Sequence, residues 1–474
     1  MILENGLVRT LDRQVPTQRA LAIAGERIAG GVGVHETSLA SPEAIDLGGR
    51  VVVPGFSDAH VHFPTWAFAQ TELDLEGCSL DEALGRVQAA ELGADGWIRG
   101  RGWRGFEPTR ESLDRVTGGT PAALVAKDGH SLWVNSAAGG PAGGVLREEE
   151  AWAFQERHLR IPDAEYLAAM RAGLKLAAAR GVTAVHDKDG GLDALSLWQQ
   201  LEAAGSLTLR VWQSVPHARL GALRALGVRS GFGSPLVRLG YLKVFMDGTL
   251  GSQTAWMLDG SGVEITGRDE LAGIVREAAE AGFPVAVHAI GDGAIRAALD
   301  AFEETREAWA PLGLRQRIEH AQLLAPNDLP RFAQLGVAAS VQFSHAPSDR
   351  DLADRFWPGK TSGAYAYRSL WESGAVVANG SDAPIEELDP LAGIRAAVRR
   401  EWHPEQALTV QQAFEATCLA PSWLAGDERR RGKLIPGYAA DLVVLDRDPW
   451  DDLGAQVVAT MVAGRWVHNP PPWD

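Results

Sequence analysis

The stretch at residues 54–63, PGFSDAHVHF, carries two histidines directly after an apolar run. We predict a strand over 51–56, so that His60 and His62 stand where this strand ends. The alternation of side chains in extended backbone turns both imidazoles to the same side. Two neutral imidazoles on one face form half of a zinc-type site. An HxH pair by itself is weak evidence, so its meaning depends on the rest of the chain.

The middle of the chain alternates helix and strand patterns. In AEYLAAMRAGLKLAAAR (164–180), apolar residues recur at helical spacing, and the buried run VTAVHD (182–187) follows. RDELAGIVREAAEA (268–281) and PVAVHA (284–289) repeat this design. Continuous apolar strands between amphipathic helices predict a parallel sheet covered by helices. We therefore expect an α/β fold, a TIM (β/α)₈ barrel, whose core strands lie at 51–56, 182–186, 209–215, 241–246, 284–288, 317–320, 337–342 and 375–380.

The two ends of the chain contain short strand patterns instead. RALAIAGERIAG (19–30) and VVATMVAGRWVH (457–468) each place two apolar runs around a glycine, which is typical of a hairpin. We predict one small β-sandwich built from residues 1–55 and 421–474, with the barrel over 56–420. The gap between the first two barrel strands is too long for a simple loop. Residues 66–162 are therefore expected to form an inserted subdomain over the barrel mouth, after barrel strand 1.

More ionisable residues follow the predicted strands. His288 and His320 end two of them, and functional residues of such barrels gather at this face. Lys243 lies within a strand, where an unpaired lysine is costly to bury. It either forms a salt bridge across the barrel or, with a lowered pKa, takes up CO₂ and becomes an N6-carboxylated lysine that bridges two cations. Asp382 follows the strand at 375–380 and either ligates a metal and accepts a proton or caps a turn.

Composition narrows the class of protein. The 474 residues carry a formal net charge of −16, which argues against nucleic acid or an anionic membrane as a partner. The two cysteines cannot build a disulfide framework. We find neither a signal peptide nor an apolar stretch long enough to span a membrane, and we expect a cytoplasmic protein. The expected partner is a small-molecule substrate, and the composition is compatible with a homo-oligomer.

The motifs together resemble the amidohydrolase superfamily, in the amidohydrolase family 3 branch that includes N-substituted formamide deformylases. They are PGFSDAHVHF, GRGW, DGHSLWVNS, GVTAVHD, KVFMDGTLGSQTA, VHAIGD, RIEHAQ, GSDAP and PGYAADLVVLD, in the family's order and over essentially the whole chain. The resemblance implies a metal-dependent barrel with a β-sandwich from both termini. It also implies that His60, His62, His288 and His320 are metal ligands, Lys243 the bridging lysine and Asp382 the catalytic aspartate. The stretch AAGGPAGGVL (137–146) is shorter than in this branch, so the substrate does not transfer from relatives.

The expected reaction is hydrolysis of a carbon–nitrogen bond, of an amide or N-substituted formamide outside a peptide. One or two divalent cations, expected to be Zn²⁺, would lower the pKa of bound water to about 7, and Asp382 would move the proton. Deamination, or hydrolysis of a lactone or ester, is the first alternative, and a non-catalytic binding protein is the distant one. Side chains expected to face the substrate are Trp103, Asp128, His130 and His345.

Overall fold

The computed structural model describes residues 1–31, 43–93, 95–190 and 193–473. Its centre is an eight-stranded, all-parallel sheet whose strands follow chain order. These strands are β8 (Phe56–Val61), β14 (Val182–Asp187), β15 (Arg210–Pro216), β16 (Val237–Phe245), β17 (Val285–Ala289), β18 (Arg317–His320), β19 (Ala338–Val341) and β20 (Val377–Asn379). The backbone N–H of Asp382 donates to the carbonyl of His60 at 2.7 Å, so the last strand's end meets the first and the sheet almost closes. This is the predicted TIM-barrel arrangement.

The predicted first barrel strand was wrong in its position. Residues Val51–Pro54 form β7, which pairs with strands of the terminal sheet, and the barrel strand β8 begins only at Phe56. Between them, the N–H of Gly55 donates to the carbonyl of Asp441. A side chain at Gly55 would meet Thr183 at 2.3 Å, so glycine is needed where the chain passes from one sheet to the other. One continuous apolar run thus serves two sheets.

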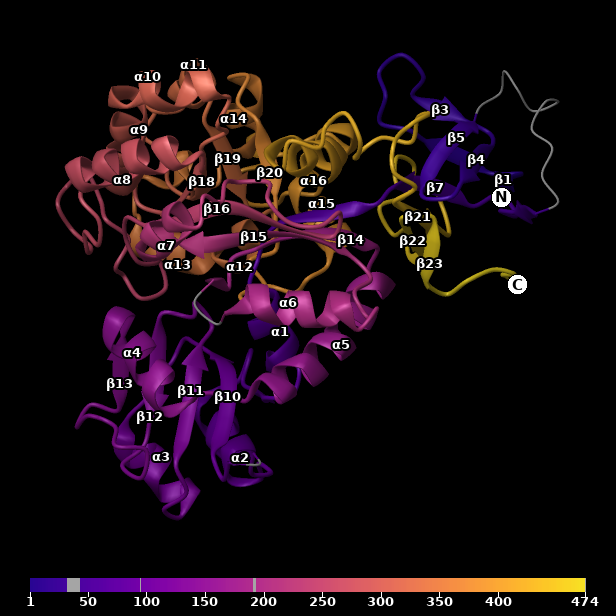
Figure 1. Ribbon diagram of the computed structural model, residues 1–474. Coiled ribbons are helices and arrows are strands. Elements are labelled where there is room, and N and C mark those ends of the chain that lie inside the picture. Colours follow the sequence, from indigo (N-terminus) through magenta and orange to yellow (C-terminus); the bar gives the residue numbers. More distant parts are fainter. Residues whose placement is uncertain (32–42, 94, 191–192, 474) are drawn as a thin grey trace.

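Helices cover the outer face of the barrel (Figure 1). The spacing in α8 (Arg268–Ala281) predicts one face with Leu271, Ile274, Val275 and Ala278; three of these are buried and Ile274 is partly buried, because this stripe faces the sheet. The remaining helices around the barrel are α5 (Asp163–Ala179), α6 (Ala194–Ala203), α7 (Leu220–Ala225), α9 (Asp292–Glu304), α10 (Arg306–Trp309), α11 (Arg331–Leu335), α12 (His345–Ser348), α13 (Arg350–Phe356), α14 (Tyr367–Glu372), α15 (Pro390–Val398) and α16 (Val410–Leu424).

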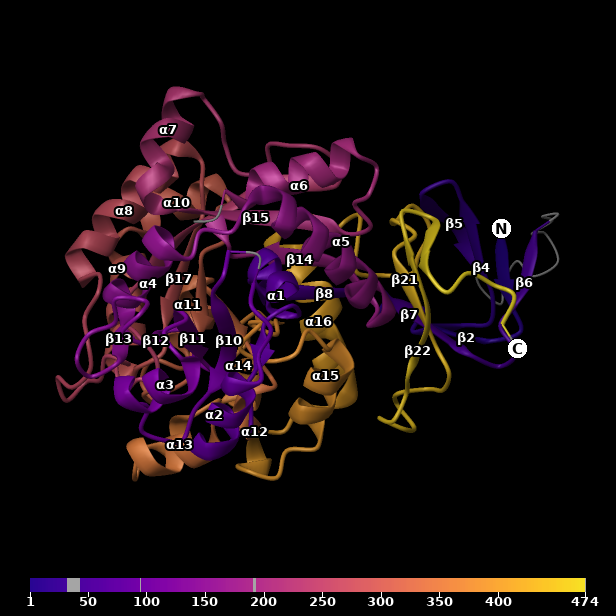
Figure 2. The same ribbon diagram turned by 90° about the horizontal axis from the view of Figure 1, so that it is seen from below.

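The segment between β8 and β14 contains a sheet of its own. After α1 (Phe63–Ala69), its elements are β9 (Leu73–Asp74), α2 (Leu80–Gln88), β10 (Ile98–Trp103), α3 (Arg110–Thr117), β11 (Ala122–Ala126), β12 (Ser131–Val134), β13 (Val145–Arg147) and α4 (Glu148–His158). The five strands are ordered β13-β12-β11-β10-β9. Figures 1 and 2 show this segment against one side of the barrel, well away from the terminal strands.

The chain ends supply two more sheets. A six-stranded sheet, ordered β23-β22-β21-β7-β2-β3, contains strands from both ends, and a four-stranded sheet is ordered β5-β4-β1-β6. Apolar residues of both sheets, among them Leu3, Leu21 and Val444, form one buried cluster. The strands are β1 (Ile2–Glu4), β2 (Leu7–Arg9), β3 (Thr17–Gln18), β4 (Leu21–Ala24), β5 (Arg27–Gly31), β6 (Ala44–Asp46), β21 (Leu442–Leu445), β22 (Val457–Val462) and β23 (Arg465–His468). In the described part of the chain, every helix is too short or too polar to cross a bilayer.

Candidate metal centre

The barrel brings the four predicted strand-end histidines together. The ring centroids of His60 and His320 lie 4.7 Å apart, and those of His288 and His320 lie 4.5 Å apart. His62 follows β8 and its ring is 5.6 Å from that of His60. Three of the rings are buried, while the side chain of His62 is 28% exposed. The exposed ring marks the side from which a small molecule could enter.

Asp382 lies among these rings. Its Oδ1 atom is 3.2 Å from Nε2 of His60 and 3.5 Å from Nε2 of His62, and its Oδ2 atom is 3.8 Å from Nδ1 of His320. The residue has φ 58°, a left-handed conformation that turns the carboxylate out of the strand direction. Burial opposes its ionisation, but the surrounding histidines hold the pKa of this carboxyl well below its usual range. Asp382 is therefore a carboxylate at neutral pH.

Two further carboxylates contact the other ring nitrogen of His60 and of His62. Oε2 of Glu319 lies 2.8 Å from Nδ1 of His60, and Oδ1 of Asp189 lies 2.7 Å from Nδ1 of His62. Each carboxylate accepts a hydrogen bond from Nδ1, which in His60 leaves the Nε2 lone pair facing Asp382. Carboxylate–histidine pairs of this kind orient metal-binding imidazoles and raise their basicity. Sequence reasoning missed both residues.

The donor set fits a cation. Nε2 of His60 is fully buried and makes no hydrogen bond within the described residues. With Nδ1 protonated, this nitrogen and the Asp382 carboxylate are both acceptors that face each other at 3.2 Å. Two acceptors at that distance repel unless a positive group lies between or beside them. His60, His62 and Asp382 also have ligand atoms close enough to share one ion, as do His320, His345 and Asp382.

Glu319 is held ionised by two buried cations. Nζ of Lys188 lies 2.9 Å from Oε1, and Nε of Arg317 lies 2.7 Å from the same oxygen. Burial alone would raise the pKa of Glu319, but these cations hold it well below its usual range. Strict strand alternation would turn Glu319 away from His320. The positive φ of His320, 70°, breaks that alternation at the strand end, so both side chains reach the barrel interior.

Lys243 is buried beneath the same site. Its Nζ lies 4.9 Å from the centroid of the Phe245 ring, and burial lowers its pKa to about 8. The alternative salt bridge across the barrel is absent from the described residues, since no carboxylate there lies within 4.0 Å of Nζ. A lysine amine with this pKa exists partly in its neutral, nucleophilic form near neutral pH.

The structure corrects the expected role of Trp103. Its ring is buried in the core of the segment between β8 and β14, where it packs against Phe106 and Trp133. Nε1 donates to the carbonyl of Leu124 at 2.8 Å. A bulge at Gly102, with φ 92°, shifts the strand and turns Trp103 toward that core. Trp103 is thus a packing residue and does not face the histidines.

The other three expected substrate contacts lie close to the histidines or their loops. The His130 ring is 5.7 Å from that of His288, and Nε2 of His345 is 3.8 Å from Oδ2 of Asp382. Asp128 is different, because its carboxylate is taken up by hydrogen bonds from Thr249 and Ser252. Of the three, His130 and His345 are the ones with a ring beside the candidate centre.

A cavity of about 650 Å³ lies between the insertion and the start of α5. Phe68, Glu72, Arg99 and Arg160 are among its lining residues. None of the strand-end histidines is among the described residues that line it. We therefore assign the chemistry to the histidine cluster, where the ligand atoms converge, and not to this cavity.

The chain matches the amidohydrolase family over residues 43–468. It belongs to that family. This amidohydrolase is 31% identical to the putative amidohydrolase YtcJ of Bacillus subtilis (strain 168), over 90% of each chain. It is 27% identical to the N-substituted formamide deformylase of Arthrobacter pascens, over 99% of this chain and 97% of that one. An uncharacterized metal-dependent hydrolase from Pyrococcus furiosus superposes with a TM-score of 0.79 at 29% identity, covering 95% of this chain and 99% of that chain.

Membership of the amidohydrolase family makes the chain a hydrolase that acts on carbon–nitrogen bonds. The candidate His/Asp sites and the metal-dependent structural neighbour support a divalent metal. The resemblance to the amidohydrolase family that the motifs indicated is confirmed, as is the prediction of an enzyme.

Proposed function

We propose that this amidohydrolase cleaves a non-peptide amide, of the N-substituted formamide type, in a small molecule. The observation that carries the proposal is the pair of facing acceptors, Nε2 of His60 and Oδ1 of Asp382, at 3.2 Å. A cation between them, with a carboxylate beside it, is the arrangement that hydrolytic metal sites need. The similarity to the formamide deformylase of Arthrobacter pascens over nearly the full length adds the substrate class.

We propose that the site holds one or two divalent cations and that these are Zn²⁺. The ligands would be His60, His62, His288, His320, Lys243 and Asp382. A cation bound there would acidify water and polarise the substrate carbonyl. An N6-carboxylated Lys243 would add a carboxylate on a long arm. Its burial and its pKa of about 8 favour that modification, because the neutral amine is the form that reacts with CO₂.

In this proposal Asp382 transfers the proton and His345 orients the substrate. Asp382 is ionised and lies beside the histidines, so it can accept a proton from the attacking water and return it to the leaving nitrogen. His345 has a buried Nε2 without a hydrogen-bond partner among the described residues. We assign His345 the role of hydrogen-bonding the carbonyl oxygen of the substrate. We assign Asp128 and His130 to the wall of the substrate site, because the His130 ring lies 5.7 Å from that of His288 and Asp128 is bound to the loop after β16.

Two architectural proposals accompany this function. We propose that residues 1–55 and 421–474 act as one accessory β-sandwich. We also propose that residues 66–162 are a subdomain that shapes the pocket at the mouth of the barrel over 56–420. The shared apolar cluster of the terminal sheets and the contact of His130 with His288 support these assignments.

A panel of substrates with three separate readouts tests the function. N-substituted formamides, cyclic amidines and lactones would be incubated with the metal-loaded enzyme, and amine, ammonia and acid release would be measured in parallel. We expect formate and amine in equal amounts from a formamide, and far slower release of both from Asp382→Asn. Ammonia without formate would assign a deaminase, acid without amine a lactonase or esterase, and no turnover with tight binding a binding protein. Each of those results would overturn the proposal.

A further inference from the structure

The insertion is hydrogen-bonded to the loop that follows β16. Oδ2 of Asp128 accepts from Oγ1 of Thr249 at 2.9 Å and from Oγ of Ser252 at 2.6 Å. Oε1 of Glu148 accepts from Oγ1 of Thr254 at 2.5 Å. Hydrogen bonds from a hydroxyl to an ionised carboxylate are charge-assisted and stronger than those between neutral groups. Two carboxylates of the insertion therefore fix the residues that directly follow the strand of Lys243.

Glycines in this loop make the approach possible. A side chain at Gly248 would meet Oε1 of Glu148 at 2.5 Å and Oγ1 of Thr254 at 2.0 Å. One at Gly251 would meet Oδ2 of Asp128 at 2.8 Å. Gly248 and Gly251 of the GTLGSQTA motif are thus needed because the insertion packs closely against this loop. The proposed hydrolysis by itself does not require glycine at these positions.

The same contacts reach His288. Nε2 of His288 donates to the carbonyl of Gly248 at 3.0 Å, which leaves Nδ1 as its free lone pair. The ring of His130 packs against that of His288, and Nδ1 of His130 lies 2.6 Å from Oε2 of Glu148. The carboxylate of Glu148 therefore has two contacts that lead to His288. It binds the ring of His130, which packs against His288, and through Thr254 it holds the loop in which the carbonyl of Gly248 accepts from His288.

Helix α4 adds an apolar contact to this arrangement. Its Trp152 ring is 5.2 Å from His130 and 5.7 Å from Phe245, and the Phe245 ring is 5.1 Å from His288. Glu148 begins this helix with φ 48°, a left-handed conformation that is unfavourable for a residue other than glycine. Such a backbone persists when the contacts around it hold it in place.

We propose that Glu148 is a positioning residue of the metal centre, which orients His288 through His130 and through the Thr254–Gly248 loop. The proposal rests on the proposed function, because it assumes that His288 holds a cation. A side chain that acts on a ligand from outside the centre fixes its ring orientation, and loss of such a partner typically weakens metal binding about ten- to a hundredfold.

The test compares Glu148→Ala with Glu149→Ala, which removes an exposed carboxylate from the same first turn of α4. Zn²⁺ affinity would be measured by chelator competition, and the ligand geometry by the visible spectrum of the Co²⁺-loaded protein. We expect Glu148→Ala to weaken Zn²⁺ binding about ten- to a hundredfold and to alter the Co²⁺ bands. Glu149→Ala should behave as wild type in both measurements. Glu148→Gln, which keeps an acceptor for Thr254, should fall between.

A second variant separates a loss of folding from a loss of positioning. If Glu148→Ala does not fold, Thr254→Val takes its place, because it removes one hydroxyl and leaves the carboxylate pair with His130. A folded Glu148→Ala with wild-type Zn²⁺ affinity and an unchanged Co²⁺ spectrum would overturn the inference while the proposed function stands. A wild-type protein that binds neither ion would instead overturn the proposed function.

Discussion

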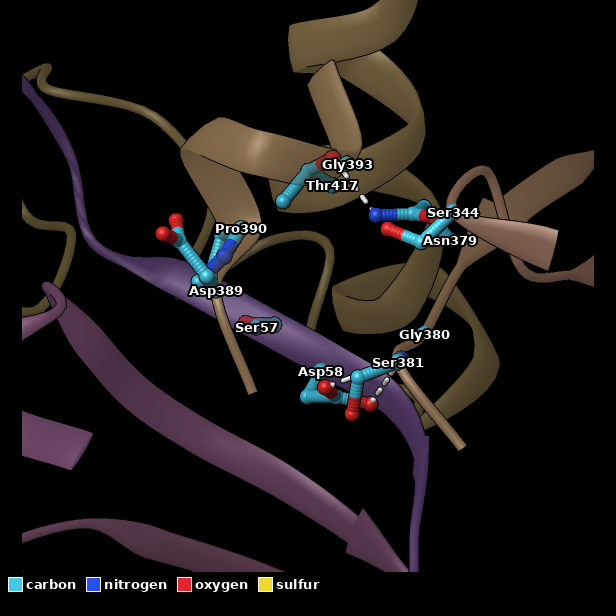
Figure 3. A pocket seen from close by; sticks show the side chains of 10 residues that line it. All are labelled: Ser57, Asp58, Ser344, Asn379, Gly380, Ser381, Asp389, Pro390, Gly393 and Thr417. Carbon is cyan, nitrogen blue, oxygen red and sulfur yellow. Dashed lines mark hydrogen bonds between the residues drawn. The ribbon is translucent and has the colours of Figure 1, made fainter. Parts of the chain in front are cut away.

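The carboxylate of Asp58 accepts a hydrogen bond of 3.0 Å from the backbone N–H of Ser381, which joins the first barrel strand to the segment after the last (Figure 3). Asp58 also accepts from the N–H of His60 at 2.9 Å. The fit at this junction is close, since a side chain at Gly380 would meet the backbone nitrogen of His60 at 2.4 Å. Asp58 thus holds His60 and the segment of Asp382 in one register.

Replacement of Asp58 should disturb both fold and activity. Asp58→Ala leaves the N–H groups of His60 and Ser381 without their acceptor, and an unsatisfied buried donor costs about 1–3 kcal/mol. We expect a loss of that size in the free energy of unfolding, measured by urea titration, together with a lower kcat. Asp269→Ala, at an exposed helix position, is the control and should change neither. Wild-type stability with wild-type kcat in Asp58→Ala would contradict the positioning role.

Asp382→Asn should separate binding from proton transfer. The amide keeps the shape and one oxygen, so the fold and most of the metal should be retained. The base is lost, so kcat should fall by about 10²–10⁴. Circular dichroism, metal analysis and single-turnover kinetics check the three parts. A variant with more than about a tenth of wild-type kcat, when chemistry is rate-limiting, would move the proton-transfer role to another residue.

Loss of a histidine should lower the metal content. His60→Ala and His288→Ala each remove a ring at the convergence of strand ends, and we expect less bound Zn²⁺ in elemental analysis after dialysis against a weak chelator. His217→Ala, outside the centre, serves as the control. Treatment of the wild type with a strong chelator should abolish turnover, and added Zn²⁺ should restore it. Full metal occupancy in both variants would refute the site assignment.

Lys243→Ala should lose one of two cations and most of the activity. The carboxylated lysine would bridge the pair, and a short carboxylate such as acetate, or added bicarbonate, should restore part of the turnover by filling the space. The ratio of metal to protein and the rescue by acetate are the measurements. An unmodified amine in a high-resolution structure of the metal-loaded wild type would argue against the bridge.

A buried ion pair away from the centre should control stability in acid. Asp441 accepts from Nε and Nη2 of Arg210 at 2.8 and 3.1 Å, and although burial opposes it, this pairing lowers the pKa of Asp441. A lowered folded-state pKa adds stability above the unfolded pKa of about 3.9, and this stability is lost as the pH falls through the folded value. Asp441→Asn should cost about 3 kcal/mol at pH 7 and less below pH 4. A pH-independent difference would contradict the assignment.

The sequence by itself determined the fold class and the main ligand candidates. Parallel strands end at one face, so a histidine at the end of an apolar run, such as His288 or His320, must reach that face wherever the strand lies in the barrel. The period of α8 likewise predicted its buried stripe without knowledge of its neighbours. These features depend on local periodicity and on the order of elements along the chain, and the amino-acid sequence contains both.

Only the tertiary structure decided which carboxylates contact the histidines in and around the candidate metal centre. Glu319 contacts His60, Asp189 contacts His62 and Glu148 contacts His130, each across a sequence separation that no local pattern encodes. The predicted strand at 51–56 is divided at Gly55, because residues 51–54 pair with β21 of the terminal sheet and Phe56 pairs with β14 of the barrel. Trp103 packs in the core of the insertion, because the bulge at Gly102 turns its side chain to that face. In each case the deciding interaction is between segments far apart in the chain, and burial fixes it only once the chain is folded.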